Sequence, residues 1–266
     1  MMTKKSMLYD ATRCTACRGC QVACKQWNDR EGYLYSQTTN TGSYQNPPDL
    51  TPQTWTLISF QEQENDGNFE WLFLKRGCFH CTDAACVAAC PTKAFLHDPE
   101  TGIVTVRPEL CNGCGYCTQF CPFGIPKLQT DTLTGEGVAF KCNFCQDRLS
   151  HGELPACVQT CTAGALSFGD RDEMVALGES RVEAAKARFP NANLYGANIL
   201  GGLGQMYVLA EAASVYGLPE NPTIDKGKIW QDIAQPIATY LPVAGLAGAA
   251  LAWIIARRNI RQEEVE

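Results

Sequence analysis

The sequence is poor in histidine and has no concentrated positive charge. Only 3 His residues accompany 16 Cys in 266 residues, and the formal net charge is −6 without any long basic run. Recognition of nucleic acid needs clustered Lys and Arg, so the sequence excludes a nucleic-acid partner. It also has no Ser-His-Asp set, no phosphate-binding loop and no GxGxxG motif after a strand. We therefore expect no small-molecule substrate and no substrate chemistry on this chain alone.

An export signal is also missing from the start of the sequence. The first residues, MMTKKSMLYDATRC, contain no apolar core segment and no twin arginine. Disulfide scaffolds are typical of short secreted chains that carry such a signal. The cysteines instead fall into four sets of four, each closed within a short window. This grouping favours four tetrathiolate metal sites over disulfide bridges.

Three of the four cysteine motifs have the compact spacing of iron-sulfur loops, and two of these end in Cys-Pro. A short loop can wrap three corners of an iron-sulfur cubane, and the fourth ligand then comes from elsewhere. The spacing therefore predicts four 4Fe-4S clusters. The motifs are Cys14, Cys17, Cys20 and Cys24; Cys78, Cys81, Cys86 and Cys90; Cys111, Cys114, Cys117 and Cys121; and the split motif Cys142, Cys145, Cys157 and Cys161.

Two points about these motifs stay open at this stage. Zinc also binds four thiolates, usually from two separated CxxC pairs, so a zinc-stabilised structural module is the alternative of a different class. The pairing of the motifs is open as well. In two-cluster ferredoxins the last Cys of one motif serves the other cluster, but each motif could also close its own cluster.

The short segments between the motifs indicate an α+β fold. We expect two interleaved bacterial-ferredoxin-like two-cluster units with short strands and helices. Strands are expected at residues 54–60 and 69–75, joined by a turn at 65–68, and at 94–96, 103–106, 165–168 and 205–210. A helix is expected at 170–189, with Asp170 as its N-cap residue.

The C-terminal region differs from the rest in having no charged residue from 233 to 256, followed by Arg257, Arg258 and Arg261. About 20 apolar residues can cross a bilayer, so this stretch predicts one transmembrane helix. The expected organisation is a four-cluster domain at 1–170, with 78–121 as an inserted two-cluster unit. A docking segment at 171–229, the transmembrane helix at 230–258 and a polar tail at 259–266 follow.

The histidines and basic residues near the motifs are not expected to be cluster ligands. With four complete Cys sets, His80, His97 and His151 have no vacant ligand position, and we expect them at the surface or in turns. Positive charge near a cluster raises its reduction potential. Basic residues gather beside the thiols at Arg13, Arg18, Lys25, Lys75, Arg76, Lys127, Lys141 and Arg148.

The sequence resembles the iron-sulfur subunits of membrane-bound formate dehydrogenases. These belong to the four-cluster subunits of molybdenum or tungsten pterin oxidoreductases. The resemblance lies in CTACRGCQVACKQWND, in KCNFCQDRLSHGELPACVQTCTAGALSFGD, in the segment from MYVL to GLPENP, and in the C-terminal apolar stretch. Equivalent subunits of nitrate, polysulfide or sulfoxide reductases and of hydrogenases share the cluster loops, and they are the alternative.

The resemblance implies partners and a location. A large pterin-containing catalytic subunit would oxidise formate and pass electrons through the four clusters to a membrane cytochrome b and quinone. The cluster-bearing part would lie on the periplasmic side of the cytoplasmic membrane, with the C-terminus cytoplasmic. The resemblance also implies crossed ligand sets. These are Cys14, Cys17, Cys20 with Cys161; Cys142, Cys145, Cys157 with Cys24; Cys78, Cys81, Cys86 with Cys121; and Cys111, Cys114, Cys117 with Cys90.

Overall fold

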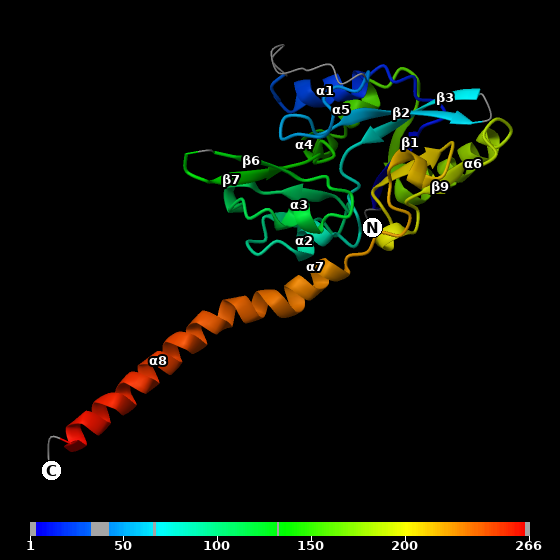
Figure 1. Cartoon of the computed structure of the whole chain (residues 1–266). Coiled ribbons are helices and arrows are strands. Elements are labelled where there is room, and N and C mark those ends of the chain that lie inside the picture. Colours follow the sequence, from blue (N-terminus) through cyan, green and yellow to red (C-terminus); the bar gives the residue numbers. More distant parts are fainter. Residues whose placement is uncertain (1–3, 33–42, 66–67, 132, 264–266) are drawn as a thin grey trace.

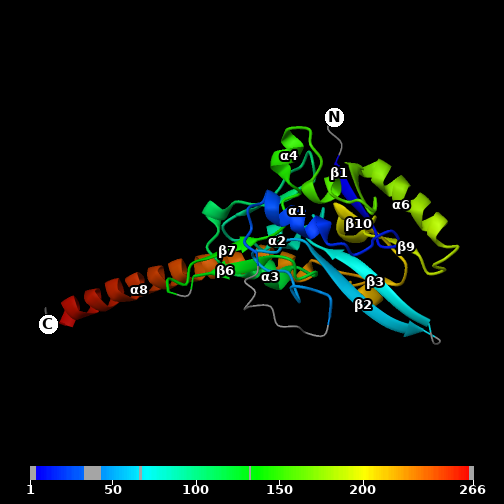
Figure 2. The same ribbon diagram turned by 90° about the horizontal axis from the view of Figure 1, so that it is seen from above.

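A body of short elements and one long C-terminal helix make up the chain. The computed structural model describes residues 4–32, 43–65, 68–131 and 133–263. In both Figure 1 and Figure 2 the C-terminal helix runs away from the body.

A four-stranded sheet in the order β8-β1-β10-β9 organises one side of the body. Its strands are β1 (Lys5–Asp10), β8 (Leu166–Asp170), β9 (Asn193–Tyr195) and β10 (Gln205–Leu209). Strands β1 and β10 pair in parallel, whereas β8 and β9 are antiparallel edge strands. The strand at 205–210 was predicted, but β1 was not. The two central strands come from opposite ends of the body's sequence. Their pairing brings together the two ends of the segments that lie between them in the chain.

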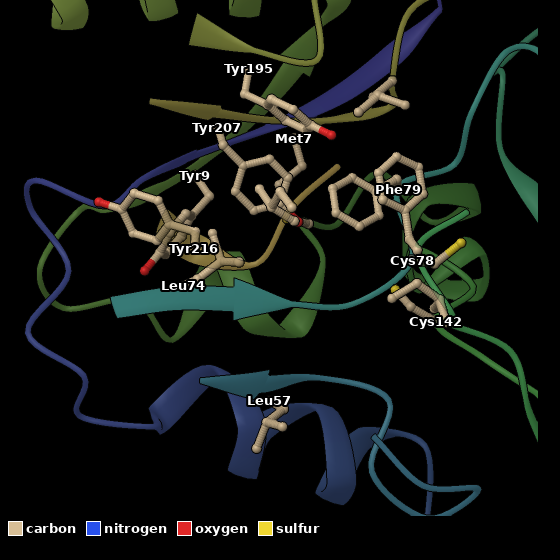
Figure 3. Close-up of a cluster of buried hydrophobic side chains, with 14 of the residues drawn as sticks. Met7, Tyr9, Leu57, Leu74, Cys78, Phe79, Cys142, Tyr195, Tyr207 and Tyr216 are labelled. Carbon is tan, nitrogen blue, oxygen red and sulfur yellow. The ribbon is translucent and has the colours of Figure 1, made fainter. Parts of the chain in front are cut away.

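The two faces of this sheet are both buried, as expected for its central strands. On one face Leu8, Met206 and Val208 pack with Met174 of helix α6 (Arg171–Ala185). On the other face lies the main core, shown in Figure 3, in which Tyr9 and Tyr207 belong to the same cluster as Phe79, Cys78 and Cys142. The predicted helix at 170–189 is confirmed in the shorter range of α6. Asp170 occupies its N-cap position, but the Asp170 side chain makes no capping hydrogen bond.

In the described ranges, three two-stranded antiparallel hairpins accompany the four-stranded sheet. They are β2 (Leu57–Asn65) with β3 (Asn68–Arg76), β4 (Phe95–His97) with β5 (Val104–Val106), and β6 (Lys127–Thr130) with β7 (Gly137–Phe140). The first two hairpins confirm predictions, although β2 and β3 are longer than expected and part of the predicted turn, residues 66–67, lies outside the described residues. The β6-β7 hairpin was not predicted.

The remaining helical segments are mostly short, and several of them carry cysteines. Those that follow or contain the motifs are α1 (Gly19–Trp27), α2 (Ala85–Ala88), α3 (Tyr116–Phe120), α4 (Gln146–Ser150) and α5 (Ala156–Gln159). Three 3₁₀ turns are η2 (Pro108–Leu110), η3 (Ile199–Gly201) and η4 (Ala213–Tyr216).

The C-terminal helix consists of α7 (Asp225–Ile229), the π-helical segment η5 (Trp230–Ala234) and α8 (Gln235–Glu263). A helix was predicted here, but its assignment as transmembrane is not supported. Across the described residues, no helix is both long enough and apolar enough to cross a membrane. Side chains at 239, 242–244 and 255–263, which the predicted span includes in part, lie outside those described.

Candidate iron-sulfur centres

Each cysteine motif has a short helix at its third Cys. Cys20 and Cys24 both lie in α1, so helical periodicity places their thiols on the same side of that helix. In the other motifs the third Cys lies in α2, α3 or α5, and the fourth Cys follows the end of the helix. Of the sixteen cysteines only Cys17 and Cys114 are exposed.

The second and third motifs exchange their last cysteines in space. Burial raises the pKa of Cys81, and the nearby thiols of Cys78, Cys86 and Cys121 raise it further. These same four cysteines line a single pocket. We refer to Cys78, Cys81, Cys86 and Cys121 as the Cys78 site.

The reciprocal exchange involves Cys90. Burial raises the pKa of Cys117 to about 12, a hydrogen bond with Thr118 lowers it, and the nearby thiols that raise it are Cys111, Cys114 and Cys90. Cys90 thus lies with the third motif and not with the rest of its own. We refer to Cys90, Cys111, Cys114 and Cys117 as the Cys90 site.

The first and fourth motifs are exchanged in the same way. Burial raises the pKa of Cys24, and the thiols that raise it further are Cys142, Cys157 and Cys145. Burial likewise raises the pKa of Cys14, and its thiol neighbours are Cys161 and Cys17. We refer to Cys24, Cys142, Cys145 and Cys157 as the Cys24 site, and to Cys14, Cys17, Cys20 and Cys161 as the Cys14 site. The four groups contain the same cysteines as the crossed sets that the resemblance implies, and their role as ligand sets stays a prediction.

Neighbouring sites also influence one another, which orders them. The thiol of Cys117 raises the pKa of Cys86, so the Cys90 site neighbours the Cys78 site. The thiol of Cys78 raises the pKa of Cys142, so the Cys78 site neighbours the Cys24 site. The thiol of Cys157 raises the pKa of Cys20, so the Cys24 site neighbours the Cys14 site. The four sites therefore follow one another in a row, with the Cys90 site at one end and the Cys14 site at the other.

Comparison with known proteins identifies the chemistry of these sites. Two families, each described as a 4Fe-4S dicluster domain, match residues 13–94 and 69–171. The formate dehydrogenase iron-sulfur subunit of Haemophilus influenzae is 39% identical over 264 residues, covering 97% of this chain and 82% of the relative. The chain belongs to the family of formate dehydrogenase iron-sulfur subunits.

A second formate dehydrogenase subunit is similarly close, and a hydrogenase protein is a more distant relative. The formate dehydrogenase-O iron-sulfur subunit of Escherichia coli K12 is 40% identical over 262 residues, covering 97% of this chain and 85% of the relative. The hydrogenase-2 operon protein HybA of Escherichia coli O157:H7 is 30% identical over 291 residues, with coverage of 97% and 85%. As a member of the formate dehydrogenase iron-sulfur family, the chain is an electron-transfer subunit with four 4Fe-4S clusters.

The pocket of the Cys78 site fits an anionic, sulfide-bearing group. His80, which lines the pocket, is only 1% exposed, and its Nδ1 accepts a hydrogen bond from the Val104 N–H at 3.1 Å. Its other nitrogen, Nε2, is buried and has no hydrogen-bond partner among the described residues. A buried polar group without a partner is costly, so a sulfide or thiolate acceptor in the pocket would satisfy it.

Lys141 brings positive charge to the same pocket, and its ammonium donates to the carbonyl oxygens of Val104 and Cys142.

The expectation that all three histidines lie at the surface or in turns is wrong for His80, because its side chain is buried. The His80 ring packs against Phe144 in a tilted arrangement, with 4.0 Å between the ring centroids. No sequence signal separated His80 from the others, because burial of this ring depends on contacts with β5 and the fourth motif.

A site for a single metal ion is not evident in the ranges 4–32, 43–65, 68–131 and 133–263. Within them, no three His, Cys, Asp or Glu side chains are placed to hold one ion.

Proposed function

We propose that this chain conducts electrons from a pterin-containing formate dehydrogenase subunit, through four clusters, to a membrane cytochrome b and quinone. Each proposed cluster is held by one crossed set: the Cys14, Cys24, Cys78 and Cys90 sites. The clusters supply one-electron carriers, and the protein holds them in order and keeps solvent away. The observation that carries the proposal is the row of four cysteine sites on a member of this family.

The two ends of the row are its accessible points. Cys17 of the Cys14 site and Cys114 of the Cys90 site are exposed, whereas all other cysteines are buried or half-buried. Electrons therefore have one place to enter and another to leave. We assign the catalytic subunit to the Cys14 end and the membrane partner to the Cys90 end.

The C-terminal helix supports this assignment of the ends. Trp230 of η5 packs against Tyr116 and Phe120 of α3, with ring-centroid distances of 4.3 and 6.2 Å. Because α3 carries Cys117, the helix leaves the body beside the Cys90 site. Large apolar side chains are exposed along it at Ile237, Leu241, Leu246, Leu251, Trp253 and Ile254. A membrane cytochrome b would cover these side chains, with the cluster-bearing body on the periplasmic side.

A hydrogenase is the second candidate for the catalytic partner, because HybA is related over 97% of this chain. The cluster sites would be the same, and only the electron donor would differ. The donor therefore has to be identified in the native complex.

The native complex, purified anaerobically, tests the proposal. We expect formate to bleach the visible absorbance of the clusters and to produce reduced-cluster EPR signals, whereas the isolated chain stays oxidised with formate. Subunit identification and metal analysis should find a molybdenum or tungsten pterin protein and a cytochrome b. Reduction by hydrogen and not by formate would replace the formate partner with a hydrogenase. Complete extraction of the complex without detergent would overturn the membrane partner.

A further inference from the structure

Lys75 is a fully buried lysine that lies among the cluster sites. It is the penultimate residue of β3 and is 0% exposed. Burying an ammonium group is costly unless an opposite charge or hydrogen bonds compensate for it. In the part of the chain that the structure describes, no Asp or Glu forms an ion pair with Lys75. Its charge is therefore balanced by something other than a carboxylate.

A closed set of hydrogen bonds fixes the position of Lys75. Its Nζ donates to Gln205 Oε1 at 3.1 Å, and Gln205 Nε2 donates to the hydroxyl of Tyr207. That hydroxyl in turn donates to the backbone carbonyl oxygen of Lys75 at 3.1 Å. All three residues are buried. The ammonium thus has little freedom to move away from its place.

The surroundings of the ammonium are cysteines of two different sites. Burial by itself would lower the pKa of Lys75, but the thiols of Cys157, Cys142, Cys20 and Cys24 raise it. Cys20 belongs to the Cys14 site, and the other three belong to the Cys24 site.

The backbone beside Lys75 brings the Cys24 site close to it. A Cβ added to Gly77 would lie 3.4 Å from Lys75 Nζ and 3.8 Å from Thr56 Oγ1. The Thr56 side chain, as a hydrogen-bonding neighbour, lowers the pKa of the Cys24 thiol against the larger effect of burial. Lys75 thus lies at the junction between the last two sites of the row.

We propose that Lys75 is a positioning residue whose fixed positive charge is shared by the Cys14 and Cys24 sites and raises the reduction potentials of both clusters. The inference rests on the ligand sets of the proposed function. When either cluster gains one electron, its negative charge increases by one and Lys75 keeps its proton. Nearby positive charge favours the reduced state. Because the same group raises both potentials, it changes the difference between them less than it changes either one.

The test is an EPR-monitored redox titration of the complex that carries Lys75→Met, with dithionite as the reductant. Met keeps an unbranched chain of similar length and removes the charge. We expect four clusters by iron and sulfide analysis, and two of the four midpoint potentials should become more negative. At a fixed potential the oxidised-to-reduced ratio of these two should rise about tenfold, which is about 59 mV for a one-electron couple.

Lys127→Met is the matched control. Lys127 forms an ion pair with Asp49 at 2.7 Å, so its charge already has a carboxylate partner. Its removal should leave all four potentials unchanged. Four unchanged potentials in a fully loaded Lys75→Met complex would overturn the proposal, and so would an equal shift of all four.

If the complex with Lys75→Met does not assemble, Gln205→Glu tests the same proposal. A carboxylate at the position of Gln205 Oε1, 3.1 Å from the ammonium, would neutralise the charge without removing Lys75. The same two potentials should fall, and their failure to fall would contradict the proposal. Because dithionite reduces the clusters without formate, this result is independent of whether formate is the substrate of the partner.

Discussion

Replacing Cys121 with Ala removes the cluster of the Cys78 site and leaves the cluster of the Cys90 site in place; this is the result that we expect. Cys121 lies in the third motif, only four residues after Cys117. Its thiol nevertheless lines the pocket of Cys78, Cys81 and Cys86. Alanine offers no ligand, so one iron corner of that cluster would lose its thiolate.

The expected loss is large in function as well as in metal content. About one quarter of the iron and sulfide should disappear, because one of four clusters is lost. The Cys78 site lies between the Cys90 and Cys24 sites in the row. Its loss opens a gap in the interior of the row, so formate-driven reduction of the quinone should fall to the background level. Iron analysis, EPR and a quinone-reduction assay measure these effects.

Cys90→Ala is the matched variant, because Cys90 is the other member of the exchanged pair. It should remove the cluster of Cys111, Cys114 and Cys117 and preserve the Cys78 site, to which Cys90 does not belong. Each variant should therefore lose the EPR signal of the cluster that the other variant keeps. If Cys121→Ala instead removes the cluster of Cys111, Cys114 and Cys117, the crossed assignment is wrong.

Local spacing predicted much of this molecule because cluster loops and hairpins are short-range features. The hairpin β4-β5 was readable from a turn between two apolar segments, and helix α6 from its N-cap residue and periodicity. Strand β1 was not readable. It pairs in parallel with β10, with Met7 opposite Gln205, and no local signal marks a partner so distant in sequence.

The same limit applies to the charged residues of the core. The sequence placed Lys75 near Cys78 only because the two are neighbours in the chain. In the structure the buried ammonium is influenced by Cys157, Cys142, Cys20 and Cys24, which belong to the first and fourth motifs. Period-two alternation predicts which side chains share a face, but it does not say what covers that face. The full burial of Lys75 could therefore be recognised only from the tertiary structure.

Replacing Gly113 with Ala is expected to prevent assembly of the Cys90 site. Gly113 lies between Cys111 and Cys114 and has φ of 71°. A Cβ at this position would lie 2.7 Å from the Cα and 2.8 Å from the N of Gly137, the first residue of β7. Both contacts are with backbone, so no side chain can rotate away. The loop would have to move, and its two cysteines with it.

Gly135→Ala separates this clash from the backbone strain. Gly135 has the same φ of 71°, but an added Cβ would meet nothing within 4 Å. A side chain in the left-handed region costs about 1–2 kcal/mol, which both variants share. Gly135→Ala should therefore keep four clusters with slightly lower stability, whereas Gly113→Ala should lose the EPR signal of one. Equal iron and sulfide contents in the two variants would show that the close approach of Gly113 to β7 does not hold the cluster loop. A loss confined to Gly113→Ala would mean that the absence of a Cβ at this point is what lets β7 support the ligands.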